Sequence, residues 1–391
     1  MIHISQPYLY DADDRSRVAS QITIDGKTEE VWFDVDKRYR EYLCFERVDA
    51  FVLGVLFVAM QKNEDIICDG PIGDYLYYQL MAEFIPAVCS GSSRMHCISI
   101  KAQIASDKLP NKGAVGTGIS CGADSLCTLA QKAHFHTESH AITHLTFFNV
   151  GANGENEKAQ KLFHSRKQRA IDFCRDYGYE LVICDSNIMN IVRQSHYITS
   201  TYTISFAVFC LQKLFSIYYL ASSTTFKNYS LKDNDLTDSS KYDLLSCYCF
   251  STDQLKMYTD GAELSRLEKI RIIANYKPAY KYLNVCTEQD ENCCRCEKCL
   301  RTISELEYVG VLERFSDVFN LDYLHKNRRQ FLRNIYHLYF TKSDYTKYYK
   351  EVWPYYRSQI NINDKLYVWY KILYSKIQYL YWKYYIDRKK N

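Results

Sequence analysis

The chain has 391 residues, of which 47% are hydrophobic and 24% are charged, and this composition excludes a largely disordered protein. Its formal net charge of only +3 excludes a uniformly basic chain. The positive charge is concentrated in residues 322–391, which carry fifteen Lys or Arg against five Asp or Glu. The apolar runs are too short or too interrupted to span a membrane, and residues 1–10 lack a secretory signal pattern, so we expect a cytoplasmic protein with reduced thiols.

Residues 1–112 are predicted to form an N-terminal α+β accessory domain. Two alternating runs within 22–34 meet at Asp25-Gly26, a dipeptide typical of a two-residue hairpin turn. Apolar residues at three-to-four spacing then predict helices over 47–62 and 74–88.

Residues 113–285 alternate between strand and helix patterns. Strands are expected at 145–150, 180–184 and 217–221, and helices at 158–177, 203–214 and 263–274. Such alternation predicts an α/β domain with a mostly parallel sheet and helices on its faces.

The sequence Ser-Cys-Gly-Ala-Asp-Ser at 120–125 precedes a predicted helix in this domain. A polyphosphate needs inward-pointing backbone N–H groups at a helix N-terminus, and small residues let the backbone approach it. The candidate nucleotide-binding residues are Ser120, Cys121, Gly122, Ala123, Asp124 and Ser125. An ionised Asp124 has no proton to donate, so we expect it to hold the Mg²⁺ that accompanies the phosphates. An ordinary turn built from the same residue types is the alternative.

A dinucleotide fingerprint is a competing interpretation of the same region, through Gly116, Gly118 and Gly122. It requires a strand that ends just before Gly116, and residues 109–113 are a poor strand. A Walker-type loop is absent, because the Gly-Lys-Thr at 26–28 has Gln21 where that loop needs its first glycine. The phosphate loop at 120–125 is therefore favoured.

Segment 286–321 contains a tight group of cysteines with the spacing C-x6-C-x2-C-x2-C. The predicted metal ligands are Cys286, Cys293, Cys296 and Cys299. Four thiolates close the coordination shell of a tetrahedral ion, which predicts a structural Zn²⁺ rather than a catalytic one. A chance cluster of free thiols and an iron–sulfur cluster are the alternatives.

The loop at 120–125 resembles the Ser-Gly-Gly-x-Asp-Ser loop of PP-loop ATP pyrophosphatases, with Cys121 in place of the first glycine of the pair. With the later cysteine spacing, residues 114–302 resemble the 7-cyano-7-deazaguanine synthases of the queuosine pathway. This resemblance implies a PP-loop domain with a parallel, Rossmann-like sheet of five strands. Residues 292–302 also look like larger relatives, some of which accompany bacterial antiphage systems. The resemblance implies binding of ATP with Mg²⁺, adenylation of a carboxylate or amide with release of pyrophosphate, and formation of a C–N bond or nitrile. It implies a deazaguanine-like acceptor, either as a small molecule or attached to a partner protein.

Further site residues are implied by this resemblance. In PP-loop enzymes the strand ends line the active site, which implies Asn149 and Val150 near the adenine and Asn187 near the ribose or substrate. The helix over 263–274 would lie over the nucleotide, so Arg266 and Lys269 would stabilise the departing pyrophosphate. Together with Asp124 they are the candidate catalytic residues. Ordinary strand-end turns and a solvated helix face are the alternatives.

Residues 322–391 are basic and contain fifteen tyrosines. Tyr and Leu recur at helical spacing from 367 to 385, which predicts a helical extension whose tyrosines pack on the core. The mixture of aromatic and cationic side chains is also compatible with nucleic-acid binding.

Two rival functions are therefore left open beside adenylation. One is a PP-loop enzyme that thiolates RNA or tRNA with a reactive thiol such as Cys121 or Cys127. The other is a catalytically inactive scaffold that binds a nucleotide.

Overall fold

The computed structural model describes residues 1–132, 137–152, 157–234, 236–341 and 343–390. The chain forms two compact units, Met1–Ser265 and Arg266–Asn391. The first unit is a mixed α/β structure built on one large, mostly parallel sheet, which agrees with the expected fold class at this level. Among the described helices, none combines the length and the apolar character needed to cross a bilayer.

The main sheet of the first unit has the strand order β13-β12-β9-β10-β11-β4-β3-β1-β5-β7, with β2 beside β3. Its strands are β1 (Ile2–Ile4), β2 (Tyr8–Ala12), β3 (Arg15–Ile24), β4 (Lys27–Asp36), β5 (Ile66–Cys68), β7 (Ile100–Lys101), β9 (Ala114–Gly118), β10 (His144–Asn149), β11 (Glu180–Ser186), β12 (Phe215–Ala221) and β13 (Lys256–Asp260). A separate small ladder joins β6 (Ile72–Gly73) to β8 (Ile104–Ala105). The helices of this unit are α1 (Asp49–Lys62), α2 (Asp74–Tyr78), α3 (Ile85–Gly91), α4 (Ala123–Lys132), α5 (Glu157–Tyr177), α6 (Met189–Val192), α7 (His196–Cys210) and α8 (Asp243–Phe250).

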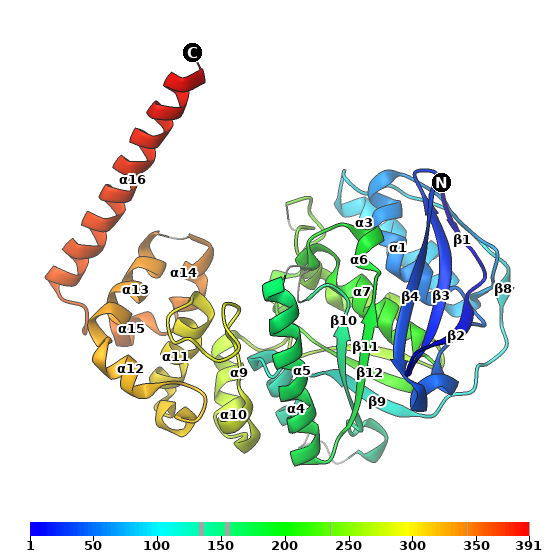
Figure 1. Cartoon of the computed structure of the whole chain (residues 1–391), viewed down its shortest axis with the longest axis horizontal. Helices are drawn as coiled ribbons and strands as arrows, with labels where there is room; N and C mark the ends of the chain where they lie inside the picture. The colour runs from blue at the N-terminus through cyan, green and yellow to red at the C-terminus, as the bar shows by residue number, and fades with distance from the viewer. Residues whose placement is uncertain (133–136, 153–156, 235, 342, 391) are drawn as a thin grey trace. The chain divides into compact units, whose positions relative to one another are not determined.

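Strands β9 to β13 are all parallel to their neighbours within this group. Helices α4 and α5 contact one face of the sheet, and α1 and α7 pack together over the other (Figure 1). Neighbouring residues of β12 accordingly belong to different apolar clusters, Ile217 and Tyr219 to one and Tyr218 and Leu220 to the other. Burial on both faces is what a parallel sheet with crossover helices requires.

The N-terminal strands continue the same sheet. Strand β4 pairs antiparallel with β11, so residues 1–112 and 113–285 share a ladder. The predicted hairpin is confirmed: β3 and β4 are joined by Asp25 and Gly26, whose φ angles of 53° and 73° are those of a type I′ turn. Helix α1 is buried along almost its whole length in the core between the sheet and α7.

Gly116 lies in the interior of β9, where a glycine would ordinarily weaken a strand. A Cβ atom built there would lie 2.6 Å from Cε1 of Phe215, whereas at Gly118 it would meet only the Tyr218 hydroxyl, at 3.7 Å. We therefore expect Gly116→Ala to lower the free energy of unfolding of the first unit by about 1–3 kcal/mol. Gly118→Ala, two residues along the same strand, is the control and is expected to change it by less than about 0.5 kcal/mol in urea unfolding. Equal effects of the two substitutions would contradict this packing.

The described part of the second unit is helical. Its helices are α9 (Arg266–Ile273), α10 (Lys277–Tyr282), α11 (Glu297–Val309), α12 (Leu321–Lys326), α13 (Arg328–Thr341), α14 (Ser343–Tyr349), α15 (Trp353–Tyr356) and α16 (Ile362–Lys390). Tyr349 and Tyr356 are fully buried, and the Tyr356 hydroxyl donates to Glu307 Oε2 at 2.6 Å. Arg328 binds the same carboxylate with two N–H groups at 2.7 and 2.8 Å. These two tyrosines pack on a core. The expectation is wrong for the described tyrosines of α16, on whose spacing it was based, because all of them are exposed: Tyr367, Tyr370, Tyr374, Tyr379 and Tyr381.

Candidate nucleotide site and metal centre

The loop at 120–125 lies at the carboxyl end of β9, where the chain turns into α4. In the sheet order β13-β12-β9-β10-β11, the chain places β10 and then β11 on one side of β9. It then places β12 and β13 on the other side, so the direction of the connections reverses between β9 and β12. In open α/β sheets, ligands bind outside the carboxyl ends of the strands at such a reversal. The residues predicted to bind phosphate therefore lie at this reversal, after the carboxyl end of β9.

The loop is organised by hydrogen bonds among its own small residues. Gly122 N–H donates to Ser120 Oγ at 3.2 Å, and the hydroxyls of Ser120 and Ser125 lie 3.1 Å apart. Ser125 Oγ also donates to the Gly122 carbonyl oxygen at 3.2 Å. Ser120 is exposed, while Gly122 and Asp124 are half-buried. Because the first N–H groups of a helix have no intrahelical acceptor, the amides of residues 123–125 suit an anion.

Cys121 adopts a backbone conformation that ordinarily favours glycine. Its φ angle is 54°, in the left-handed region, which costs a side-chain-bearing residue about 1 kcal/mol. The thiol is 1% exposed, and burial raises its pKa to about 12. A residue with a side chain therefore makes this turn, and its thiol is buried in its neutral form.

The residues predicted at the ends of the next two strands have different roles. Asn149 ends β10, and its Nδ2 donates to Asp185 Oδ1 at 2.8 Å, at the same edge as the loop. Val150 is buried. Asn187 is bound to β4, because its Nδ2 donates to the Glu30 carbonyl oxygen at 2.7 Å and its Oδ1 accepts the Trp32 N–H at 2.8 Å. Through these two bonds the Asn187 side chain joins the segment after β11 to strand β4.

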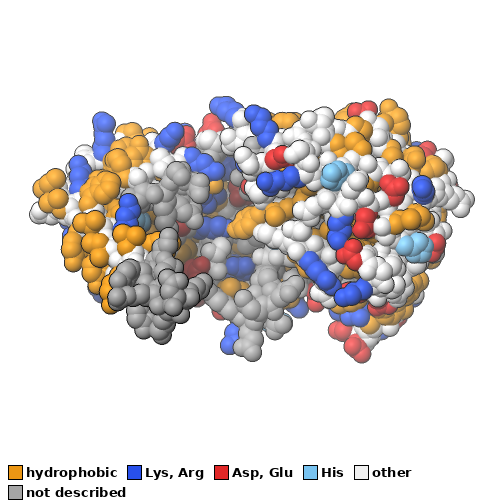
Figure 2. Space-filling model, turned by 90° about the horizontal axis from the view of Figure 1, so that it is seen from above, with side chains coloured by type: hydrophobic (Ala, Val, Ile, Leu, Met, Phe, Trp, Pro, Cys, Tyr) orange, Lys and Arg blue, Asp and Glu red, His pale blue; other side chains and the backbone are white. Residues whose placement is uncertain are grey.

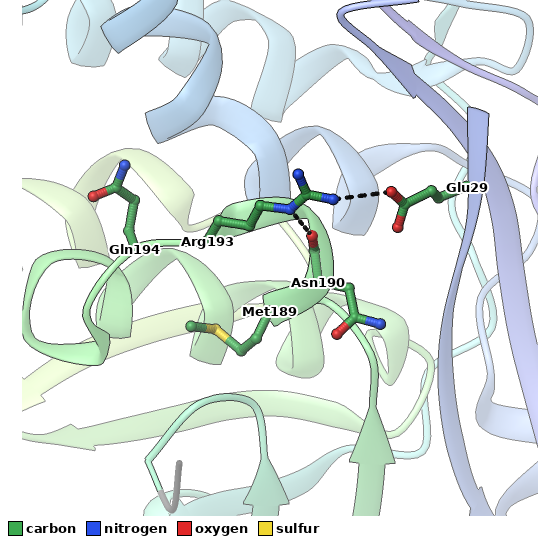
Figure 3. A pocket seen from close by; sticks show the side chains of 5 residues that line it. All are labelled: Glu29, Met189, Asn190, Arg193 and Gln194. Atoms are coloured by element: carbon green, nitrogen blue, oxygen red, sulfur yellow. Dashed lines mark hydrogen bonds and ion pairs between the residues drawn. The ribbon is translucent and has the colours of Figure 1, made fainter. Parts of the chain in front are cut away.

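A polar pocket lies beside the same edge, where α6 follows β11 (Figure 3). It is lined by Glu29, Met189, Asn190, Arg193 and Gln194. Arg193 spans it, donating to Glu29 Oε1 at 3.1 Å and to the Asn190 carbonyl oxygen at 2.6 Å. The sequence interpretation did not include these residues, because the pocket exists only once β4 pairs with β11.

The two predicted catalytic cations, Arg266 and Lys269, belong to the second unit. Arg266 Nε lies 3.3 Å from Glu305 Oε2, and its NH2 group donates to Thr302 Oγ1 at 3.0 Å. Lys269 is 3% exposed. Arg266 thus connects α9 to α11, and neither side chain belongs to a solvated helix face. Their part in catalysis remains a prediction.

The four predicted metal ligands come together in the second unit. The sulfur atoms of Cys286, Cys293, Cys296 and Cys299 all lie within 4.8 Å of one another. The Sγ–Sγ distances are 3.9 Å for Cys286 and Cys296 and 4.0 Å for Cys293 and Cys299. A tetrahedral ion with metal–sulfur bonds of about 2.3 Å needs sulfur atoms about 3.8 Å apart. The cluster therefore fits one metal ion of the zinc type.

The surrounding backbone holds this arrangement of thiols. The N–H groups of Glu288 and Cys296 donate to the sulfur atoms of Cys286 and Cys293, at 3.4 and 3.3 Å. Buried Asn292, which the sequence interpretation did not single out, donates to the carbonyl oxygens of Leu283 at 2.8 Å and Val318 at 3.0 Å. The contact between the two thiols lowers the pKa of Cys296 and raises the pKa of Cys299.

A buried carboxyl group lies near the carboxyl end of β12. Asp243, at the start of α8, accepts a hydrogen bond from the Thr201 hydroxyl and lines a small cavity with Ser222. Burial raises the pKa of Asp243 to about 7. The acid is therefore largely neutral below neutral pH.

This shift predicts a pH dependence of stability. Asp243 titrates near pH 3.9 when unfolded, so between about pH 4 and pH 7 the folded protein holds a proton that the unfolded chain has released. The free energy of unfolding should therefore fall as the pH rises through this range, by up to about 4 kcal/mol. Asp243→Asn should remove this contribution to the fall in the free energy of unfolding, as measured by urea unfolding of the first unit at several pH values. An unchanged pH profile would contradict the assignment.

Comparison of the chain with protein-family models, with curated proteins and with solved structures gave no match.

Proposed function

We propose that the chain is a PP-loop enzyme that binds ATP at residues 120–125 and adenylates an acceptor. The observation that carries this proposal is the glycine-like turn at Cys121, between the strand at the topological reversal and the N-terminus of α4. The turn leaves the amides of the first turn of α4 at the carboxyl edge of the sheet. Such amides stabilise the negative charge that develops on a leaving pyrophosphate.

The proposed reaction has two steps. The oxygen of an acceptor carboxylate attacks the α-phosphorus of ATP, forming an acyl adenylate and breaking the bond to pyrophosphate. A nitrogen nucleophile then attacks the acyl carbon, and AMP leaves with the bonding electrons while the nitrogen loses a proton. No protein nucleophile is needed, so the task of the chain is to position the reactants and to stabilise charge. Asp124 would hold the Mg²⁺, whose chemistry is to neutralise the phosphate oxygens.

The acceptor class in this proposal rests on the resemblance to deazaguanine synthases. A 7-carboxy-7-deazaguanine would supply the carboxylate, and ammonia or an amine of a partner protein would supply the nitrogen. The pocket at Arg193 lies in the same unit, where α6 follows β11. Its guanidinium, which binds the Glu29 carboxylate in this structure, is a group that would suit an acceptor carboxylate.

The cysteine cluster is proposed to bind Zn²⁺ as a structural ion. Four thiolate ligands leave no coordination position for a water or a substrate, so the ion would stabilise the second unit rather than take part in the reaction.

The burial of the candidate thiols favours adenylation over sulfur transfer. Cys121 and Cys127 are each 1% exposed, and the pKa of Cys121 is raised to about 12 by burial. A sulfur-transfer enzyme needs an exposed thiol that ionises readily.

Product analysis tests the proposed reaction. The protein is incubated with ATP, Mg²⁺, 7-carboxy-7-deazaguanine and ammonium. The nucleotides and deazaguanines are then separated and identified by mass spectrometry. We expect AMP and pyrophosphate in equal amounts, with a product in which nitrogen has replaced the carboxylate oxygen. ADP and phosphate as the products would contradict the proposal, and ATP binding without turnover with any acceptor would favour the inactive scaffold.

A further inference from the structure

Helix α16 contains a seven-residue repeat. The pair Leu-Tyr occurs at 366–367, again at 373–374 and again at 380–381, within one uninterrupted helix. A repeat of seven residues returns to nearly the same side of a helix and is the pattern of a coiled coil. Tyr370 and Ile377 occupy the alternating positions, so the apolar residues follow the four-three spacing of a coiled-coil seam.

This seam is exposed to solvent. Leu366, Leu373 and Leu380 are 60, 58 and 62% exposed, and Tyr370 and Ile377 are 63 and 55% exposed. Figure 2 shows hydrophobic side chains gathered over this part of the second unit, at the left of the view, with Lys and Arg among them. A contiguous exposed apolar surface of this kind marks an interaction site.

The first turns of α16 are held by the rest of the second unit. Asp364 accepts hydrogen bonds from Arg329 at 3.0 Å and Arg333 at 2.9 Å, and Trp369 Nε1–H donates to the Tyr336 hydroxyl at 3.0 Å. From residue 373 to residue 382 every side chain is exposed. Most helical stability in proteins comes from packing of an apolar face, so a partner along this exposed face would stabilise the second half of α16.

We propose that α16 forms a parallel two-stranded coiled coil with α16 of a second copy of the chain. With Leu366, Leu373 and Leu380 at the d positions, Tyr370 and Ile377 take the a positions. Leucine at d favours two-stranded coils, and a single polar Asn at an a position, here Asn363, specifies register.

The charges beside the seam favour the parallel arrangement. In a parallel pair, position g of one helix faces position e of the other, five residues further on. Lys376 at g would then face Tyr381 of the second copy, and a cation over a tyrosine ring is attractive. In an antiparallel pair the g positions face each other, which would bring Lys376 close to another lysine. Four of these five seam residues are Leu or Ile, which offer no ring on which a base can stack, so the seam favours a second helix over a nucleic acid.

The oligomeric state of the full-length protein tests this proposal. Leu373→Glu combined with Leu380→Glu places two charges in the seam, and Ser375→Glu combined with Tyr379→Glu places two charges on the opposite side of the same helix. In analytical ultracentrifugation we expect the unaltered protein and the second variant to be dimers. The seam variant should raise the dimer dissociation constant by about 100-fold or more. A monomeric unaltered protein, or equal behaviour of the two variants, would overturn the proposal.

Disulfide formation tests whether the two helices run parallel. In a parallel pair each d residue meets its own counterpart, so Leu373→Cys should form a 373–373 disulfide under mild oxidation, and Gln378→Cys should not. Peptide mass spectrometry identifies the bond among the native thiols. A Leu373→Cys variant that stays unlinked would exclude the parallel arrangement. If the unaltered protein is a monomer that binds single-stranded RNA, and the seam variant loses that binding, the occupant is a nucleic acid instead.

Discussion

Asp124→Asn is expected to lower the rate of pyrophosphate release from ATP by about 100-fold or more. The substitution keeps the size of a half-buried side chain in the first turn of α4 and removes its charge. Without that charge, the metal that neutralises the phosphate oxygens is held less well. The rate is measured at saturating ATP and Mg²⁺ with an enzyme-coupled assay for pyrophosphate.

A matched change of charge at the other edge of the sheet is the control. Asp253 precedes the start of β13 and forms an ion pair with Lys108 at 3.5 Å. Asp253→Asn is expected to leave pyrophosphate release within about twofold of the unaltered protein, since exposed ion pairs contribute little. Equal losses in the two variants would mean that the effect of Asp124→Asn does not arise at the loop.

Cys299→Ser is expected to abolish stoichiometric zinc binding and to unfold much of the second unit. Cys299 lies in the first turn of α11, and its sulfur is in the group of four thiols that joins this helix to the segment before it. Loss of a structural metal is one of the few single changes that costs about 4–5 kcal/mol. Zinc content is measured by metal analysis, and unfolding by hydrogen exchange over residues 266–341.

The neighbouring thiol of Cys294 provides the control. It is buried but lies outside the group of four, and it contacts the Asn292 carbonyl oxygen at 3.5 Å. Cys294→Ser should retain one zinc per chain. If Cys299→Ser also retained one zinc and unchanged exchange, the proposed structural role of the metal would be wrong.

Local patterns were sufficient to predict several features of the fold. Asp25-Gly26 identified the β3–β4 hairpin because both residues tolerate positive φ, and three-to-four spacing identified α1. The cysteine spacing identified the four thiols that the fold brings together, because most of that geometry is set within a short segment.

Features that depend on distant pairing were not predicted. The ladder between β4 and β11 joins residues far apart in the chain, and it forms the pocket at Arg193 and engages Asn187. Helix α7 begins at His196, earlier than the expected residue 203, in a stretch rich in Thr and Ser. These residues are weak helix formers, and packing against α1 outweighs that preference.

Two further omissions have different causes. Strand β13 has a short, half-polar sequence that does not stand out without its partner β12. The repeat in α16, in contrast, is visible in the sequence as Leu-Tyr every seven residues, but a helix that packs one face on a core shows the same spacing.

A crystal structure with Mg²⁺ and α,β-methylene-ATP, which cannot release pyrophosphate, tests the central claim most directly. We predict that the β- and γ-phosphates accept hydrogen bonds from backbone N–H groups of residues 122–125, at about 2.8–3.0 Å. A nucleotide bound elsewhere, with the loop after β9 making no contact to phosphate, would contradict the account.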